Sequence, residues 1–385
     1  MTGERTAPAA TPSIRCYVTT SEVHEQLTRF WEVEEGPWTH ALSEEEKLCE
    51  THYTRREQDG RYVVRPPVNS KVRQLGDSYA LALGRVKSLE RALARNPIQR
   101  DQYRAFMKEY ETLGRMTRLK QITTTEGYYL PHHAVRKEDL TTKLRVVFDA
   151  SARTSTGLFL NDALMTGPTI QNDLFTILTR FRKHKFVITA DIAKMYRQIH
   201  VAPADRHYQK ILWRDDPTKP LRTYRWNTVT YGTAFAPYLA TRTLHQLASD
   251  KEEIYSRAAV TFKSDFYMDD LITNADTYED ALALRQLASK GGFELRQCAS
   301  NHPGLVPAPA SNDDPPVLTI ATDQSKKTVG LAWHRNGDSL RYNILKFPNQ
   351  QRVSKRTMLS YIAQLFDPLG LLGPVIAKAK LFLQA

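Results

Sequence analysis

Two adjacent carboxylates interrupt an apolar pair of predicted strands in the second half of the chain. In the run FYMDDLIT, Asp269 and Asp270 stand at the tip between two apolar segments, a pattern that predicts a β-hairpin. An apolar strand pair tolerates such groups only where they face solvent or a cation. An earlier run, FVITADIAKMY, brings Asp191 to the end of another apolar strand. These patterns favour a fold in which strand ends meet around acidic groups.

If Asp191, Asp269 and Asp270 converge, they form an all-oxygen site that suits magnesium better than zinc. Such a site fits phosphoryl transfer, because two metal ions about 3.5–4 Å apart can activate an attacking hydroxyl and stabilise a leaving pyrophosphate. Taken alone, YMDD is more typical of an exposed turn rich in Asp. The neighbouring motifs therefore decide between the two interpretations.

The hydrophobic patterns predict an α+β fold. Between residues 21 and 120 we expect helices, two of them with apolar and aromatic stripes that indicate a buried core rather than a ligand site. From about residue 121, short β-rich runs alternate with helical runs. The predicted strands are 144–150, 185–191, 208–213, 221–226, 261–267 and 271–274, and the predicted helices are 172–184, 233–248 and 278–288. A Pro-rich connector, 302–316, precedes a predicted hairpin and a helix–turn–helix.

The charge balance is basic. The 385 residues include 54 Lys and Arg against 42 Asp and Glu, a formal net charge of +12. Nucleic acid is the first candidate for a polyanionic partner, although an idle, solvated basic surface has the same composition. Three widely spaced cysteines predict neither a disulfide framework nor a zinc site. No run has the apolar length of a membrane span, so we expect a soluble protein in a reducing compartment.

The order of the motifs is more specific than any one of them. The runs are YYLPHHAVRKED, KLRVVFDASA, LNDALMTGPTIQNDLFTILTRFR, FVITADIAKMYRQIHV, VTYGTAFAPYLA, FYMDDL, GGFELRQCASN, VGLAWH and LSYIAQLFDPLGLLGPV. This series resembles the reverse transcriptases of BEL/Pao-type long-terminal-repeat retrotransposons. The resemblance covers almost the whole chain beyond Ser21.

The resemblance implies a right-hand polymerase with an α+β palm. We expect a flexible lead at 1–20, a helical N-terminal extension at 21–120, fingers at 121–184, a palm at 185–315, a primer-grip hairpin at 316–345 and the start of a thumb at 346–385. The sequence stops inside the last predicted helix, so we expect an incomplete thumb and a fragment of a longer protein. We expect no aspartic protease, ribonuclease H or integrase in this chain.

The resemblance also implies roles for the acidic residues. Asp191 and Asp269 would bind two Mg²⁺ ions, for which Mn²⁺ can substitute, with help from the backbone carbonyl of Ile192. Asp270 would support them. The block that holds Arg296 lacks the lysine expected to protonate pyrophosphate, so that role stays open.

The nucleotide-binding residues implied by the resemblance are Lys137, Arg145, Tyr196, Tyr231 and Gly232. Lys137 and Arg145 would grip the triphosphate, since a Lys charge and an Arg fork suit phosphate oxygens. Without the Asp motifs they would be read as basic residues on a solvated hairpin. Tyr196 would lie under the sugar and exclude a 2′-hydroxyl, unless it is simply a core aromatic. Tyr231 replaces the glutamine of retroviral enzymes, which questions sugar contacts and fidelity rather than activity.

Residues next to the template and primer follow from the same resemblance. They are Pro237, Tyr267, Met268, Gly330 and Trp333, of which the last two belong to the predicted primer-grip hairpin. His132 and His133 carry no metal-ligand spacing, and we interpret them as structural.

The resemblance implies an RNA- and DNA-templated DNA polymerase that extends a primer with deoxynucleoside triphosphates. A second interpretation is a non-catalytic or domesticated retrotransposon remnant that binds nucleic acid, which the incomplete thumb favours and the retained acidic residues oppose. A third, an RNA polymerase, is disfavoured by Tyr196. We expect no membrane association and an intracellular location, in the cytoplasm within a virus-like particle. The native primer, processivity and oligomeric state stay open.

Overall fold

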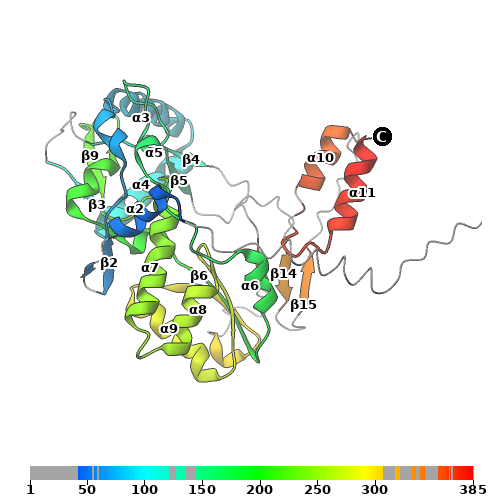
Figure 1. Cartoon of the computed structure of the whole chain (residues 1–385). Coiled ribbons are helices and arrows are strands. Elements are labelled where there is room, and N and C mark those ends of the chain that lie inside the picture. The colour runs from blue at the N-terminus through cyan, green and yellow to red at the C-terminus, as the bar shows by residue number, and fades with distance from the viewer. Residues whose placement is uncertain are drawn as a thin grey trace, which may run out of the picture. The chain divides into compact units, whose positions relative to one another are not determined.

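The chain divides into two compact units, Met1–Ser43 and Glu44–Ala385, and almost all described residues belong to the second. This computed structural model is shown in Figure 1. It describes residues 42–53, 56–58, 60–120, 127–135, 144–306, 317–320, 331–334, 339–342, 354–363, 365 and 367–384. Within these ranges no helix combines the length and apolarity needed to cross a membrane.

A four-stranded antiparallel sheet forms the centre of the predicted palm. Its strand order is β10-β11-β6-β12, and every neighbouring pair is antiparallel. The bounds are Phe266–Tyr267 for β10, Asp270–Ala275 for β11, Phe186–Ile192 for β6 and Leu295–Ser300 for β12. Strand β6 is the apolar run predicted to end in a carboxylate, and nearly all of it is buried because it lies between two other strands and between two covered faces.

The period of two along β6 separates the two faces of this sheet. Phe186, Ile188 and Ala190 pack into the main hydrophobic core, which also contains residues of α7, α8 and α9. Val187 points the other way, into a second cluster with Trp333 and residues of α6. The helices are α6 Leu174–Arg180, α7 Ala236–Asp250, α8 Ser256–Ser264 and α9 Tyr278–Lys290. In Figure 1, α7, α8 and α9 lie beside the sheet, in agreement with their contacts with each other and with the contacts of α8 with β10 and of α9 with β11 and β6.

One predicted strand is wrong. Residues 261–267 were expected to be a strand, but most of them belong to helix α8, and only Phe266–Tyr267 is extended. Helix α8 buries Ala258, Ala259 and Phe262, which recur at helical spacing. The β-forming residues within the segment are overridden because packing against α7 and α9 buries this stripe. The other predicted strands and helices of the palm are confirmed.

The region predicted as a helical extension contains strands as well as helices. Helices α2 Glu44–His52, α3 Tyr79–Ala94 and α4 Pro97–Thr112 are present, and the stripes of α3 and α4 are buried, as predicted for a core. Strands β1 Arg56–Gln58 and β2 Arg61–Val64 were not predicted. Strand β2 pairs in parallel with β7 His200–Val201. Strand β7 follows shortly after Asp191 in the chain. Tyr62 and Val64 belong to the main core, so this region packs together with the palm residues.

Smaller sheets complete the described fold. The hairpin β4-β5 lies in the predicted fingers segment, whereas the three-stranded sheet β3-β9-β8 combines one strand of the predicted extension with two of the predicted palm. The predicted C-terminal hairpin is confirmed, because β14 pairs with β15 as well as with β13. Their bounds are β3 Met116–Arg118, β4 His132–Val135, β5 Arg145–Phe148, β8 Lys210–Trp213, β9 Arg222–Trp226, β13 Val317–Ile320, β14 Leu331–His334 and β15 Ser339–Tyr342.

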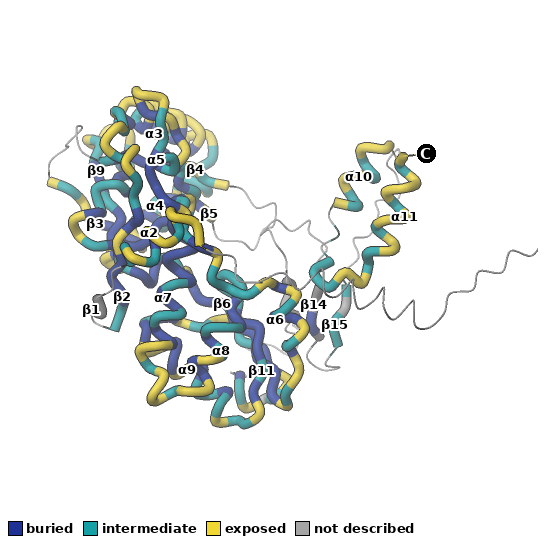
Figure 2. The backbone as a smooth tube through the Cα atoms, viewed as in Figure 1, coloured by how far each residue is buried: buried dark blue, intermediate teal, exposed yellow. Residues whose placement is uncertain are grey.

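The helical segments that remain are short or lie near the C-terminus. The predicted helix–turn–helix is present as α10 Lys355–Ala363 and α11 Gly373–Gln384, and Figure 2 shows no buried residue in either. The others are α5 Leu160–Ala163 and the 3₁₀ helices η1 Ser70–Gln74, η2 Met195–Gln198, η3 Pro203–Gln209 and η4 Pro303–Leu305. The mixed α+β class is therefore confirmed.

Candidate active site

The alternation of the central strands places two carboxylates on one face. In β6, Asp191 shares a face with Val187, and in β11, Asp270 shares a face with Ile272. Val187 and Ile272 both pack in the second hydrophobic cluster, so this is the same face of the sheet. Asp270 is also the direct cross-strand partner of Asp191. Directly opposed side chains have Cβ atoms about 4.5–5.5 Å apart, so the sheet itself brings these two carboxylates together.

The third carboxylate lies in the tight turn between β10 and β11. Tyr267 pairs with Asp270, which leaves Met268 and Asp269 as the turn. Met268 has a φ of +57°, in the left-handed region that side chains seldom adopt. The backbone N–H of Met268 donates to Oε1 of Gln171 (3.1 Å), and the carbonyl of Asp269 accepts from the N–H of Ile192 (2.8 Å). The turn is thereby held against the end of β6, beside Asp191.

We call Asp191, Asp269 and Asp270 the carboxylate edge. Its electrostatics reflect burial and like charge. Burial, then the charge of Asp269 and a hydrogen bond to it, raise the pKa of Asp191 to about 6, which Arg296 partly opposes. Burial, then the charges of Asp269 and Asp191, raise the pKa of Asp270 to about 7. A bound cation would relieve this repulsion.

The donor chemistry of the carboxylate edge fits a hard divalent cation, because all its side-chain ligands are carboxylate oxygens. The raised pKa values of Asp191 and Asp270 also favour a cation, because a bound positive charge would stabilise the ionised carboxylates. Within the described ranges, however, no three His, Cys, Asp or Glu side chains are grouped closely enough to hold an ion. The residues fit the cation in kind, while the positions of their side chains here do not complete a ligand set.

Tyr196 follows the first carboxylate on η2. It is half-buried, packs against the main core and has a pKa raised to about 12 by burial and by the charge of Asp269. Its ring therefore has both a core contact and a carboxylate neighbour. The two interpretations given to Tyr196, core aromatic and sugar contact, are compatible in this position.

The loop before α7 presses closely on β5. Gly232 has a φ of +94°, and a Cβ built on it would lie 2.3 Å from the carbonyl oxygen of Phe148. Tyr231 donates its hydroxyl to the carbonyl of Val146. Asn161, which the sequence patterns did not single out, donates to the carbonyl of Gly232 (3.1 Å) and accepts from the N–H of Ala234 (2.9 Å). The predicted glycine is needed here because no side chain fits.

The other predicted nucleotide and primer residues are spread over several elements. Arg145 lies exposed at the start of β5, and its charge acts on Tyr231. Pro237 is exposed in the first turn of α7. Trp333 is fully buried and meets the ring of Phe181 edge-on, with centroids 5.6 Å apart. Two further predicted residues, Lys137 and Gly330, lie outside the described residues.

His132 lies fully buried in β4, directly opposite Phe148 of β5. Its Nδ1 is hydrogen-bonded to the hydroxyl of Tyr103, and its Nε2 to the carbonyl of Leu212 (2.9 Å). Burial lowers the pKa of His132 to about 4. These contacts agree with a structural role.

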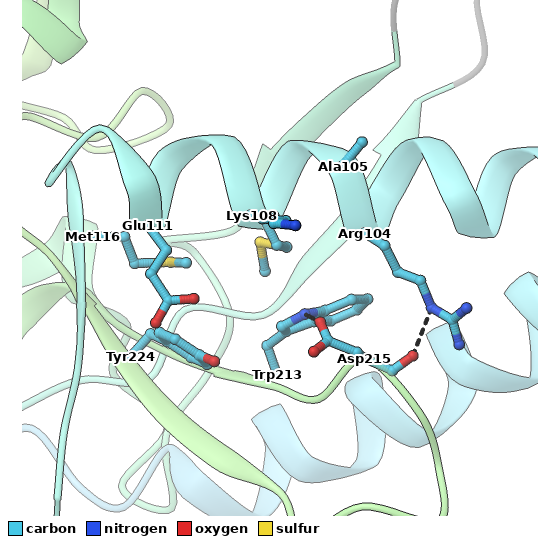
Figure 3. Close-up of a pocket in the computed structure, with 9 residues that line it drawn as sticks. Arg104, Ala105, Lys108, Glu111, Met116, Trp213, Asp215 and Tyr224 are labelled. Atoms are coloured by element: carbon cyan, nitrogen blue, oxygen red, sulfur yellow. Dashed lines mark hydrogen bonds between the residues drawn. The ribbon is translucent and has the colours of Figure 1, made fainter.

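A cavity of about 370 Å³ lies apart from the carboxylate edge, between α4 and the strands β8 and β9. Figure 3 shows Trp213 and Tyr224 across from α4, and Arg104 of that helix extends toward Asp215, with its Nε donating to the carbonyl of Asp215 (2.6 Å). Trp213 and Tyr224 are themselves almost fully buried. The cavity contains no residue that the sequence predicted for catalysis.

Comparison with known families adds independent information. Residues 136–294 match the family model described as reverse transcriptase (RNA-dependent DNA polymerase). This segment contains the whole carboxylate edge and every predicted nucleotide-binding residue. Residues 136–294 are therefore similar to a reverse-transcriptase domain.

A second match lies C-terminal to the reverse-transcriptase domain. Residues 354–385 match the model of a Pao retrotransposon-like RNaseH-like domain. The predicted BEL/Pao-type resemblance is thereby confirmed. These residues coincide with the predicted thumb segment, whose boundary stays a prediction, and the match goes against the expectation that this chain contains no ribonuclease H sequence.

Two solved structures show a more distant likeness to this chain. The foamy viral protease-reverse transcriptase dRH in complex with double-stranded DNA has 16% identity and a TM-score of 0.43, with 66% of this chain and 38% of that chain covered. The foamy viral protease-reverse transcriptase in complex with an RNA/DNA hybrid has 14% identity and a TM-score of 0.47, with 75% and 34% covered. The chain therefore spans little more than a third of the length of either structure. No curated protein matches the sequence.

Proposed function

We propose that this chain is the polymerase part of a reverse transcriptase that extends a primer along an RNA or DNA template, using deoxynucleoside triphosphates. The observation that carries the proposal is the cross-strand pairing of Asp191 with Asp270, beside the Asp269 turn, inside the matched reverse-transcriptase segment. The net charge of +12 supports a nucleic-acid partner. A reaction of this kind belongs inside the cell, and we propose the cytoplasm, within a virus-like particle.

The carboxylate edge would hold two Mg²⁺ ions, with Mn²⁺ able to substitute. Asp191, Asp269 and the carbonyl of Ile192 would supply the ligands, and Asp270 would support them. Bound there, the two ions would activate the primer 3′-hydroxyl and neutralise the leaving pyrophosphate. The protein's own part is to hold acidic oxygens at a sheet edge where their repulsion favours cation binding.

The neighbouring residues would position the nucleotide. Lys137 and Arg145 would bind the triphosphate, and Tyr196 would lie under the sugar. The tight approach of Gly232 to β5 supports a loop whose backbone comes close to the nascent base pair, with Tyr231 beside it. These positions would favour DNA over RNA synthesis.

The remaining assignments concern template and primer. Pro237, Tyr267, Met268 and Gly330 would lie next to the duplex. Because Trp333 is fully buried against Phe181, we propose that it anchors the primer-grip hairpin rather than contacting the primer.

The test is primer extension by the purified chain on poly(rA)/oligo(dT) with Mg²⁺ and dTTP. We expect extension by the wild type and none by Asp269→Asn, with Asp101→Asn, an exposed carboxylate on α4, as the matched control. Fluorescence anisotropy of labelled template-primer should show the same affinity for all three proteins. Affinity should also fall steeply with salt, because each phosphate contact contributes a slope of about −0.7 to −0.9 in log K against log salt.

Two outcomes would contradict the proposal. Full extension by Asp269→Asn would remove the metal-binding assignment. A wild type that binds template-primer but never extends it would favour the alternative, a retrotransposon remnant that only binds nucleic acid.

A further inference from the structure

Arg197 is a buried cation without a carboxylate partner. It lies on η2, directly after Tyr196, and is 1% exposed. Within the described part of the chain its Nη1 donates to the hydroxyl of Thr230 (3.2 Å), while Nε and Nη2 have no hydrogen-bond partner. Burial lowers its pKa, and no acidic residue is among the groups that oppose this. An uncompensated buried charge is destabilising, and an apolar side chain of similar size would avoid the penalty.

Aromatic faces take the place of a counter-ion. The guanidinium carbon of Arg197 lies 3.8 Å from the ring centroid of Trp226, 5.0 Å from that of Tyr231, and 5.4 Å from those of Phe148 and Tyr110. We call Arg197 and these four rings the arginine cage. A cation is attracted to a ring face by the ring quadrupole, and the attraction strengthens away from water. This attraction depends on the orientation of each ring, so Arg197 restrains the rings around it.

The arginine cage joins three chain segments that carry proposed nucleotide-binding residues. The first is η2, where Arg197 follows Tyr196. The second is the loop that contains Thr230, Tyr231 and Gly232, which Arg197 contacts by its hydrogen bond and by the Tyr231 ring. The third is β5, which contributes Phe148 and begins with Arg145.

The three segments also contact each other around the guanidinium. Tyr231 meets Phe148 edge-on with centroids 5.4 Å apart, and its hydroxyl donates to the carbonyl of Val146. Phe148 meets Trp226 edge-on at 4.9 Å. Arg197 is the charged group common to these contacts, yet full burial prevents it from touching a nucleotide itself. Its influence on the reaction must therefore pass through the rings.

We propose that Arg197 is a positioning residue for the incoming nucleotide, which holds the Tyr231 loop in register with Tyr196 and with β5. The proposal rests on the proposed polymerase function. Loss of the guanidinium leaves the reacting groups present but releases the loop, so nucleotide binding is weakened more than the chemical step. The carboxylate edge and the grip on template-primer are unaffected.

The experiment measures extension kinetics of Arg197→Met and Arg197→Lys with dTTP on poly(rA)/oligo(dT). For Arg197→Met we expect KM for dTTP to rise by about tenfold, while kcat changes by less than about threefold. Misplacement of bound groups can cause losses of this size or larger. Arg197→Lys keeps the charge but not the planar fork, so its KM should lie between wild type and Arg197→Met. Affinity for template-primer should not change.

Two controls separate positioning from loss of stability. Leu287→Ala removes a fully buried side chain of α9, far along the chain from the arginine cage, and lowers stability without touching its rings. Arg85→Met removes an exposed arginine of α3. Neither control should raise KM for dTTP. A KM for Leu287→Ala that rises as much as for Arg197→Met would overturn the proposal.

A double-mutant cycle tests the route through Tyr231. If Arg197 acts through that ring, the effects of Arg197→Lys and Tyr231→Leu on KM should be strongly non-additive. Additive effects would overturn the proposal. Should Arg197→Met not fold, Arg197→Lys and Thr230→Val, which removes only the hydrogen-bond acceptor, test the same prediction in KM. An unchanged KM in both would remove the role of Arg197 alone, whereas a wild type that never extends would remove the polymerase function and this inference together.

Discussion

The carboxylate edge and the arginine cage both take charge out of water without an ion pair, but they balance that charge differently. In the carboxylate edge, Asp191 and Asp270 oppose each other across two strands, and the protein relieves their repulsion only in part, through the charge of Arg296. In the arginine cage, four ring faces surround Arg197, and the protein supplies the compensation itself. A partly exposed cluster of like charges is suited to an external cation, whereas an enclosed cation stabilises a local geometry.

The first prediction separates function from stability at the carboxylate edge. Asp191→Asn should lower primer extension by at least about a thousandfold, the scale of loss of an essential catalytic group. The same change should raise the Tm in EDTA at pH 8, because it removes one of the mutually repelling charges that raise the pKa of Asp270. Differential scanning calorimetry and extension assays measure the two effects. A Tm that falls together with activity would show that Asp191 supports the fold instead.

The second prediction disturbs the backbone contact beside the arginine cage. Gly232→Ala should lower the free energy of unfolding by about 3 kcal/mol, from about 1–2 kcal/mol of left-handed backbone strain and about 1–3 kcal/mol of overpacking against Phe148. Gly157→Ala is the matched control, because Gly157 also has a positive φ (+85°) but would meet nothing within 4 Å. In urea unfolding, Gly157→Ala should lose only the part of the free energy of unfolding that comes from backbone strain. Equal losses in the two variants would mean that the close approach to β5 is unimportant.

The third prediction concerns His132, a buried neutral side chain beside the arginine cage, in contrast to the buried charge of Arg197. His132 meets Phe148 of the arginine cage with centroids 6.0 Å apart, and burial lowers the pKa of His132 to about 4. The unfolded chain binds this proton near pH 6.5 and the folded chain only near pH 4, so stability is lost as pH falls between these values. At 1.36 kcal/mol per pKa unit the loss is at most about 3–4 kcal/mol.

A comparison of two histidine variants isolates the contribution of His132 to the loss of stability at low pH. His132→Gln should reduce the loss of stability on acidification from pH 7 to pH 4.5, measured by urea unfolding at each pH. His133→Gln, at an exposed neighbour on the same strand, should leave most of the loss in place, because burial is the main cause of the lowered His132 pKa and the charge of His133 a smaller one. If both variants keep the full pH dependence of the wild type, then other groups cause it.

The fourth prediction concerns Tyr196, which stands between the carboxylate edge and the arginine cage. Tyr196→Ala should raise use of UTP relative to dTTP by an amount on the order of 1–3 kcal/mol, because the ring that would clash with a 2′-hydroxyl is gone. Tyr196→Phe keeps the ring and should keep the discrimination. The ratio of kcat/KM for the two nucleotides on one template is the measurement. An unchanged ratio in an active Tyr196→Ala enzyme would leave the ring as a core residue only.

Local patterns were sufficient for most strands and helices of the predicted palm. The runs 185–191 and 271–274 were predicted as strands and are β6 and β11, because apolar residues that continue between flanking turns are typical of a buried strand. The strand predicted at 261–267 was wrong, because Phe262 belongs to the buried helical stripe of α8. Strand β2 was not predicted, because it is short and its partner β7 lies far along the chain. Residue patterns report local preference. The pairing of strands that lie far apart in the chain is decided by tertiary packing.

The sequence by itself determined which residues could carry the chemistry: carboxylates at two strand ends, a tyrosine after the first, and ordered motifs that resemble those of reverse transcriptases. Only the tertiary structure decided that Asp270 opposes Asp191, because strand register depends on packing of Val187 and Ile272 in a shared cluster. It likewise decided that Arg197 is enclosed by rings from four separate segments. In sequence Arg197 is one basic residue among 54 Lys and Arg, and burial by distant segments is a property that no local pattern contains.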